Sequence, residues 1–415
     1  MLGMDEAGYY IYLPATFIYH DVGHLAFYPQ MEAKYNLSNG VKWYAIYDEP
    51  GGFKLNKYPL GTAIFELPFF FAAHIVCLLQ PATYPPDGYS APYLLGVALA
   101  PLFWVLAGLV MLCRFLRHYC SDIVTALTLL LLAFGTNLFF YTVFTSGMSH
   151  PFSFALFCFL LFYTRRWYAG ERVSDVLFIG LIIGLIVITR PTNAVVALIP
   201  LCWQYKEGRL SDKLAFFRRQ FLPVVSAGII CLLVIMLQLS YWKLVTGSWL
   251  SFSYKEEGFN FLSPQVWNGL FSYRKGWFVY TPLALIGVIG LIPLARTYKK
   301  MAAIILLYFA VNIYIVFSWC NWPYGSSFGC RALIESLAVL ALPLALLIQW
   351  IFAGRKKVFN AGMLTLFCCI VALNLFQSVQ LLHNVVPWDG VNKAFYWRAF
   401  ANPDIKEEDK KLLSQ

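Results

Sequence analysis

Residues 5–21, with the sequence DEAGYYIYLPATFIYHD, form a polar and aromatic segment in a chain that is otherwise mostly apolar. The segment opens with two adjacent carboxylates, Asp5 and Glu6, and continues with tyrosines spaced among apolar residues. This amphipathic pattern favours helices that lie on a membrane surface over helices that cross the membrane. The sequence therefore predicts that the segment faces an aqueous compartment, with the later apolar stretches as its scaffold.

The composition of the chain indicates that most of it lies in lipid. Of its 415 residues 60% are hydrophobic and 13% are charged, whereas a soluble domain has roughly 25% charged residues. Apolar runs long enough to cross a hydrocarbon layer of about 30 Å recur along the chain. The net charge of +10 lies in short basic clusters between these runs, so it does not indicate binding to nucleic acid. We expect an all-α, polytopic transmembrane helical bundle.

The chain divides by composition into four parts. Residues 1–59 are predicted to form an external acidic loop with amphipathic helices, and residues 60–91 an interfacial or re-entrant segment. Residues 92–382 are predicted to form the transmembrane helical domain, followed by an external tail, residues 383–415, with a charged and poorly ordered end.

About ten spans are expected in the transmembrane domain. The predicted spans are residues 92–113, 121–145, 148–164, 174–189, 192–204, 220–244, 278–295, 301–318, 331–352 and 358–382.

Lysine and arginine counts in the connecting loops predict the orientation of these spans. Sixteen of these residues lie in one alternate set of loops, at residues 114–120, 165–173, 205–219, 296–300 and 353–357, which is therefore assigned to the cytoplasm. The other loops, with residues 1–59 and the tail, are then external. This arrangement requires that residues 60–79 do not cross the membrane fully, and Pro59 and Pro68 favour a re-entrant or interfacial path because proline interrupts helices.

Five short motifs follow one another on the predicted external side. They are Asp5-Glu6, Lys57-Tyr58-Pro59-Leu60-Gly61, Ile188-Thr189-Arg190-Pro191-Thr192-Asn193, Phe271-Ser272-Tyr273-Arg274-Lys275-Gly276-Trp277 and Tyr324-Gly325-Ser326-Ser327-Phe328-Gly329-Cys330-Arg331. In the order of these motifs and in their common external side, the chain resembles the GT-C glycosyltransferases. This family includes protein O-mannosyltransferases, aminoarabinose transferases and a large bacterial set. The resemblance runs from Asp5 to about residue 350.

The chain departs from the family pattern in two places. The second motif lacks the histidine of the family's His-Pro-Pro-Leu sequence. Family members also carry a transmembrane helix before the acidic motif, whereas this chain begins four residues before Asp5. We expect either that the true start lies upstream or that a core helix has been lost.

The resemblance implies transfer of a sugar from a polyprenyl-phosphate donor to an acceptor hydroxyl on a glycan, lipid or protein. It implies an inverting reaction at the external face of a bacterial inner membrane. Asp5 is the candidate general base, because a carboxylate within hydrogen-bond reach can accept the hydroxyl proton, and Glu6 is its helper or a metal ligand. The alternative is that both acids are solvated at a helix start, where the helix dipole favours them.

The leaving group would be a lipid phosphate, whose developing charge requires cations. The candidate substrate-binding residues are Lys57, His150, Arg190, Arg274, Lys275 and Arg331. Arginine is the best match because its planar fork binds phosphate through two hydrogen bonds, and we rank Arg274 and Arg331 highest. The alternative is that some of these cations anchor spans at the membrane interface, and that His150 caps a helix.

Four other features of the sequence leave alternatives open. Glu66 either faces the site or pairs with Lys57, and Glu335 is interpreted as the ion-pair partner that orients Arg331. Carboxylates such as Asp5, Glu6 and Asp21 are ligands that Mg²⁺ or Mn²⁺ prefers, and a divalent cation is an open alternative. Two cysteines, Cys320 and Cys330, share one loop, and a disulfide between them is an open alternative to two free thiols if that loop is periplasmic.

Two other functions compete with glycosyl transfer. A transporter or flippase of lipid-linked sugars would need charges along a path through the membrane, usually with inverted repeats. Here the charges gather at one face, which favours the enzyme. The other alternative is an inactive membrane partner or fragment that lacks its first helix.

Overall fold

The apolar runs of the sequence form helices, and the polar segments between them form turns and short 3-10 helices. The structure, a computed structural model, describes residues 4–37, 45–203, 210–354 and 356–414, so parts of the basic loops 205–219 and 353–357 lie outside it. Within these ranges the strands form one antiparallel pair, β1 (Ile46–Asp48) and β2 (Lys54–Asn56). The predicted all-α fold class is confirmed.

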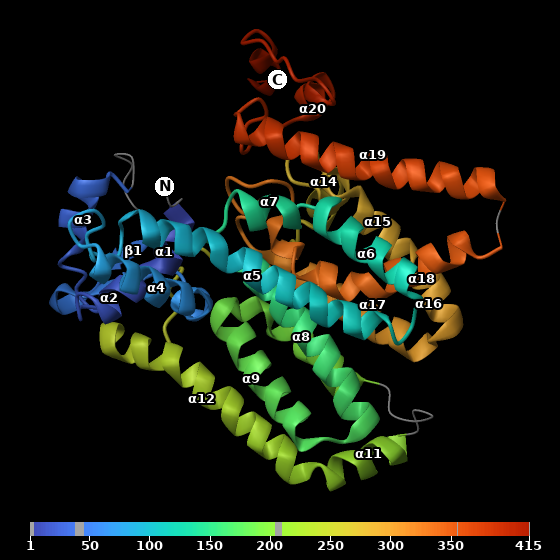
Figure 1. Ribbon diagram of the computed structural model, residues 1–415, viewed down its shortest axis with the longest axis horizontal. Helices are drawn as coiled ribbons and strands as arrows, with labels where there is room; N and C mark the ends of the chain where they lie inside the picture. Colours follow the sequence, from blue (N-terminus) through green and yellow to red (C-terminus); the bar gives the residue numbers. More distant parts are fainter. Residues whose placement is uncertain (1–3, 38–44, 204–209, 355, 415) are drawn as a thin grey trace.

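Short elements before the first long apolar helix form a lobe packed around tyrosines, at the left of Figure 1. Buried tyrosine hydroxyls hold this lobe in place: Tyr12 donates to the carbonyl of Tyr58 at 2.6 Å, and Tyr10 donates to the carbonyl of Gly88, in the loop that follows α4, at 2.5 Å. Besides the strands, the lobe contains α1 (Met4–Tyr10), α2 (Tyr12–Phe17), α3 (Tyr28–Tyr35) and the 3-10 helix η1 (Pro50–Gly52).

Five of the described helices are long and apolar enough to cross a membrane, judged by length and composition. They are α4 (Gly61–Leu79), α5 (Ala91–Leu116), α12 (Phe221–Thr246), α17 (Lys299–Ser318) and α19 (Lys357–Leu382). Only 11% of the most apolar window of α12 and 17% of that of α19 is buried inside the protein, against 56% for α17. These two helices lie at the edges of the bundle in Figure 1, where their apolar side chains would face lipid.

Every predicted span corresponds to at least one helix, but several spans are divided. The remaining elements of this region are α6 (Asp122–Phe134), α7 (Leu138–Val143), α8 (Ser149–Gly170), α9 (Val173–Thr189), η2 (Pro191–Ala197), α10 (Leu198–Cys202), α14 (Trp277–Tyr280), α15 (Pro282–Ile289), α16 (Leu291–Thr297), η3 (Arg331–Leu333) and α18 (Ser336–Phe352). Pro191 and Pro282 start new elements because proline donates no backbone hydrogen bond to the preceding turn.

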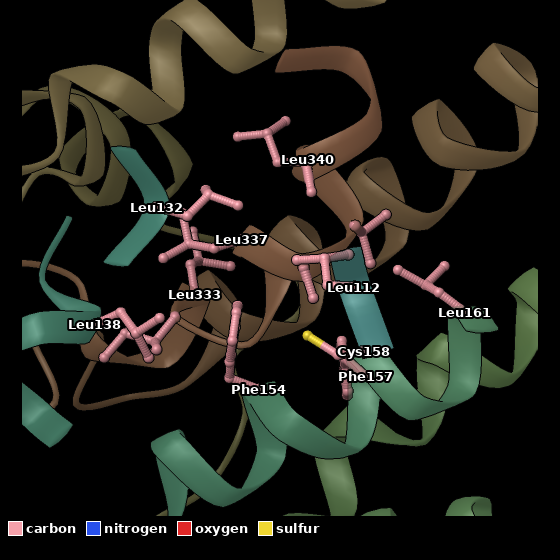
Figure 2. Close-up of a cluster of buried hydrophobic side chains, with 14 of the residues drawn as sticks. Leu112, Leu132, Leu138, Phe154, Phe157, Cys158, Leu161, Leu333, Leu337 and Leu340 are labelled. Carbon is pink, nitrogen blue, oxygen red and sulfur yellow. The ribbon is translucent and has the colours of Figure 1, made fainter. Parts of the chain in front are cut away.

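The central helix of the bundle is α18, whose residues from Ser336 to Ile348 are all buried. Figure 2 shows how leucines from this region meet side chains of α5, α6 and α8, among them Leu112, Leu132 and Phe154. Interlocking apolar side chains of this kind fix the helices that surround α18. The first turn of α8 and η3, just before α18, are therefore held in one place relative to each other.

Apart from α4 and the elements of the N-terminal lobe, the elements outside the predicted spans are short. They are α11 (Leu210–Arg219), α13 (Val266–Phe271), α20 (Lys393–Ala399) and η4 (Asp409–Ser414). The charged end of the chain, expected to be poorly ordered, forms η4, and Asp409 pairs with Arg398 at 2.8 Å. The disulfide between Cys320 and Cys330 is not formed, since both residues are free thiols.

Candidate functional site

The first charged pair of the site joins α1 to η3. Asp5 Oδ2 lies 3.0 Å from Arg331 Nη1, and Asp5 Oδ1 accepts a hydrogen bond from the Tyr58 hydroxyl at 2.5 Å. Both charged side chains keep some exposure, 14% for Asp5 and 16% for Arg331, so a polar ligand from outside can reach them. The pair therefore offers one carboxylate and one guanidinium at an accessible surface.

The second charged group joins the end of α9 to the starts of α8 and α18. Arg190 Nε lies 3.4 Å from Oε1 of the fully buried Glu335, and His150 Nδ1 lies 3.3 Å from Glu335 Oε2. Arg190 Nη1 is 3.3 Å from His150 Nε2. Because a guanidinium donates and cannot accept, His150 Nε2 must be the acceptor. His150 is therefore neutral, with its proton on Nδ1 directed at Glu335.

Local sequence explains why Arg190 lies beside the motif around Tyr58. Arg190 is extended at the end of α9, and Pro191 then begins η2. The first residue of α4 packs directly against this turn, since a Cβ on Gly61 would be 2.5 Å from Thr189 Oγ1. Only glycine allows so close an approach. The chain that leads from Tyr58 into α4 is thereby held against Arg190.

Tyr9 lies between the two charged groups. Its ring is 4.6 Å from the ring of Tyr58, and its hydroxyl accepts a hydrogen bond from Ser149 at 3.2 Å. Burial raises the pKa of the Tyr9 hydroxyl and outweighs the opposing effect of the Arg190 guanidinium. Tyr9 therefore stays protonated at neutral pH and separates the two ion pairs with a polar, uncharged group.

These side chains form one group, which we call the paired-arginine cluster. It consists of Asp5, Tyr9, Tyr58, His150, Arg190, Arg331 and Glu335. Four predicted site residues are among them, namely Asp5, His150, Arg190 and Arg331. The interpretation of Glu335 as the partner of Arg331 is wrong, because Glu335 pairs with Arg190 while Asp5 pairs with Arg331.

The contributions of Tyr9 and Tyr58 were missed by the sequence reasoning. Tyr9 lies in the opening segment and Tyr58 in the second motif, but the chain has 26 tyrosines, so the residue type alone does not mark these two. The sequence does mark the position of Tyr58, because this residue directly precedes Pro59-Leu60-Gly61, where an apolar helix begins. That position fixes the direction of its backbone but not of its side chain.

The described contacts of Lys57 and Glu6 are with residues outside the cluster. The Lys57 ammonium pairs with Glu257 and lies 4.9 Å from the centre of the Tyr254 ring, so its pairing with Glu66 is not observed. Glu6 is buried against Gly147, where a Cβ would be 2.8 Å from the Glu6 Cβ. Glu66 is buried in α4, and neither of its carboxylate oxygens has a hydrogen-bond partner in the described part of the protein.

Two more predicted site residues, Arg274 and Lys275, contact the segment after α19. Arg274 binds Asp389 through two hydrogen bonds of 2.9 and 2.8 Å, and the buried Lys275 ammonium donates to the carbonyls of Ser327 and Trp388. Together these contacts clamp the segment after α19 onto the loop that precedes Arg331. Both cations thus join segments of the chain that are distant in sequence.

The stability of this clamp is expected to depend on pH. Burial lowers the pKa of Lys275 to about 7, against the opposing attraction of Asp389 and with the repulsion of Arg331 and Arg274. Between pH 7 and the ordinary pKa of lysine, the Lys275 side chain keeps its proton only in the unfolded chain. The free energy of unfolding therefore rises with pH in that window. We expect the free energy of unfolding of the native protein to rise, relative to that of Lys275→Met, by up to about 1.4 kcal/mol per pH unit from pH 7 to 9. Parallel thermal unfolding at each pH checks this, and equal pH slopes for the two proteins would contradict it.

The carboxylates proposed as metal ligands do not come together. Asp21 accepts hydrogen bonds from the backbone N–H groups of His24 and Ala26, and Asp5 is engaged by Arg331. Across the described ranges, no three His, Cys, Asp or Glu side chains are grouped as a metal site requires. The described residues therefore supply no such group for the divalent cation that the sequence left open, and no chemical step is assigned to a metal.

Comparison with known proteins includes a structural likeness of low similarity. No protein-family model matches the chain, and no curated protein matches it. A solved structure described as the archaeal oligosaccharyltransferase AglB from Archaeoglobus fulgidus, in complex with an inhibitory peptide and a dolichol-phosphate, overlaps 90% of this chain at 11% identity and a TM-score of 0.45. The overlap spans about half, 54%, of that protein.

Proposed function

We propose that this protein is a polytopic membrane glycosyltransferase of GT-C type. It would move a sugar from a polyprenyl-phosphate donor to a hydroxyl of a glycan, lipid or protein acceptor at the external face of a bacterial inner membrane. The observation that carries this proposal is the paired-arginine cluster, in which the carboxylate of Asp5 pairs with Arg331 and a second guanidinium, Arg190, is held by the buried Glu335. Apolar helices long enough to hold the protein in lipid surround it.

In the proposed reaction the donor phosphate binds between Arg190 and Arg331. Each guanidinium is a strong donor to phosphate oxygens, and each already faces partly open surface. Arg190 is held from behind by the buried Glu335 and His150, so its position is set before any ligand binds. Such fixed charges stabilise negative charge that develops on a leaving phosphate.

Binding of the donor would also activate Asp5. While Arg331 contacts Asp5, its positive charge makes the carboxylate a weak base. A phosphate that draws Arg331 away would restore the basicity of Asp5, with the Tyr58 hydroxyl still holding the carboxylate in place. Asp5 would then accept the proton of the acceptor hydroxyl.

Bond making and breaking balance in a single displacement. The acceptor oxygen forms a bond to the anomeric carbon as its proton passes to Asp5. The bond between that carbon and the phosphate oxygen breaks, and its electron pair remains on the phosphate that the arginines hold. Attack from the face opposite the leaving group inverts the configuration of the sugar.

Replacement of Arg331 tests this function. We expect Arg331→Gln to lower kcat/KM for transfer from a panel of polyprenyl-phosphate sugars by about 10²- to 10³-fold, the usual effect of removing one donor to developing charge. Arg398→Gln is the matched control, because Arg398 is exposed and pairs only with the tail residue Asp409 among its recorded ion pairs. Equal activity of Arg331→Gln and the native protein, or no transfer by the native protein with any donor of the panel, would overturn the proposal.

A further inference from the structure

A second charged region lies at the opposite, predicted cytoplasmic end of the bundle. A hollow of about 620 Å³ opens between the ends of α5 and α8. Its lining residues are Arg114, Arg117, His118, Phe162, Arg165, Arg166, Ala169, Gly170 and Arg172, and we call it the five-arginine hollow. The proposed glycosyltransferase chemistry uses none of them.

Only part of the positive charge in the five-arginine hollow is neutralised. Arg117 pairs with Asp122 at 2.7 Å, and Arg166 pairs with Asp175 at 3.0 Å. For Arg114, Arg165 and Arg172, no acidic partner is recorded within the described ranges. The carboxyl-terminal ends of α5 and α8 each contribute roughly half a negative charge. Set against the three arginines, this leaves an excess of about two positive charges.

The electrostatics of His118 agree with this excess. Partial burial and then the neighbouring Arg165 guanidinium lower the pKa of His118. The imidazole therefore adds no charge of its own at neutral pH. The excess resides in the guanidiniums, which stay charged at any pH the protein meets.

The hollow has a fixed shape because α5 and α8 pack closely along their lengths. A Cβ on Gly108 would be 2.8 Å from the Cα of Ala155, so the two backbones touch where glycine permits it. Figure 1 shows both helices ending on the same side of the bundle. Since α5 is apolar enough to span the membrane and ends at Leu116, the hollow lies at the level where hydrocarbon gives way to water.

We propose that the five-arginine hollow binds the phosphate headgroup of an anionic phospholipid from the cytoplasmic leaflet. Guanidiniums bind phosphate oxygens in pairs, and basic pockets between membrane helices on this side suit anionic headgroups. The hollow is open at the membrane surface, and Phe162 and Ala169 supply apolar lining for the glycerol end of a lipid. A lipid is the occupant that reaches this level by lateral diffusion, whereas free phosphate must leave bulk water.

The same arginines have a simpler explanation, which a binding experiment separates from the proposal. Positive residues in loops set the orientation of spans without binding any particular lipid. If the arginines only set the orientation of the spans, lipid binding should show no saturable site and no preference among anionic molecules. A built site predicts one lipid per protein and a loss of binding when the three arginines without acidic partners are replaced.

The experiment compares the native protein, a test variant and a control variant in neutral detergent micelles. The test variant is Arg114→Gln/Arg165→Gln/Arg172→Gln, and the control is Arg218→Gln/Lys356→Gln/Lys357→Gln, which removes the same charge from exposed residues outside the hollow. Native mass spectrometry measures the binding of phosphatidylglycerol, with phosphatidylcholine for comparison. In a second arm, inorganic phosphate competes with phosphatidylglycerol.

We expect the native protein and the control to hold one phosphatidylglycerol and to prefer it over phosphatidylcholine. The test variant should bind phosphatidylglycerol on the order of 100-fold more weakly, because each cation at an anionic surface contributes roughly a five-fold factor. Equal binding by the test and control variants would overturn the proposal. Full displacement by millimolar phosphate would overturn the assignment to a lipid. If the triple variant does not fold, Arg165→Gln alone replaces it and is expected to weaken binding about five-fold.

These outcomes are independent of glycosyl transfer. The lipid site rests on residues at the far end of the bundle from the paired-arginine cluster. Loss of phosphatidylglycerol binding with normal transfer would support the lipid site without affecting the proposed function. Failure of every donor in the transfer assay would leave the lipid measurements intact.

Discussion

Replacement of Asp5 by asparagine is expected to lower the transfer rate by about 10²- to 10⁴-fold, the range that a positioned general base contributes. Asparagine preserves the size of the side chain and still accepts the hydrogen bond from Tyr58, but it cannot take up the acceptor proton. It also removes the charge that holds Arg331, so donor binding should remain or tighten. The expected result is therefore a loss in kcat with KM unchanged or lowered, measured with the donor that the native protein uses.

A matched variant shows whether the effect is specific to the site. Asp48→Asn removes the same charge from the same N-terminal lobe, but the Asp48 side chain is 85% exposed and pairs with Lys54. Its transfer rate should equal that of the native protein. If Asp5→Asn transfers sugar at the native rate, Asp5 is not the base, and Glu6 becomes the next carboxylate to replace.

Replacement of Glu335 by alanine is expected to destabilise the protein by about 3–5 kcal/mol, the usual cost of removing one partner of a buried ion pair. Glu335 is fully buried, and its removal would leave Arg190 without its counter-ion and the Nδ1–H of His150 without an acceptor. The free energy of unfolding in a graded denaturant series measures this effect. An isosteric Glu335→Gln variant should lose less, because its amide oxygen can still accept from His150.

A repacking variant separates the cost of an unpaired charge from the value of the pair. The double variant Arg190→Met/Glu335→Leu removes both charges and fills the space with apolar groups. Replacing a whole buried pair in this way is often neutral for stability. We expect the double variant to be more stable than Glu335→Ala yet inactive in transfer, because the guanidinium for the phosphate is gone. A double variant as unstable as Glu335→Ala would show that shape, not charge, dominates at this position.

The helices were predictable from sequence because long apolar runs and proline positions carry enough information. The run at 358–382 corresponds to α19 within one residue at its start. Divided spans were less predictable, since the run at 278–295 is uniformly apolar yet forms three short helices. Hydropathy reports which residues avoid water, but it does not report where a backbone turns inside an apolar environment.

The site was predictable in its residue types and only partly in its pairing. The acid and the cations were found because charges are rare in this chain and cost energy near lipid. Which acid contacts which cation depends on how α1, α9 and η3 approach one another, and no local pattern encodes that. The spacing of Arg331 and Glu335, one helical turn apart, suggested a local pair, but the structure directs each side chain to a partner distant in sequence.

The ion pair between Asp5 and Arg331 has a consequence for biosynthesis. Its two halves lie in α1 and η3, with most of the helical bundle between them in the chain, so the ribosome must complete nearly all of that bundle before the pair can form. Contacts between such distant segments form late, because a long chain must first be brought together. The paired-arginine cluster is therefore incomplete while the nascent chain is being inserted, and it forms only once the last core helices have docked.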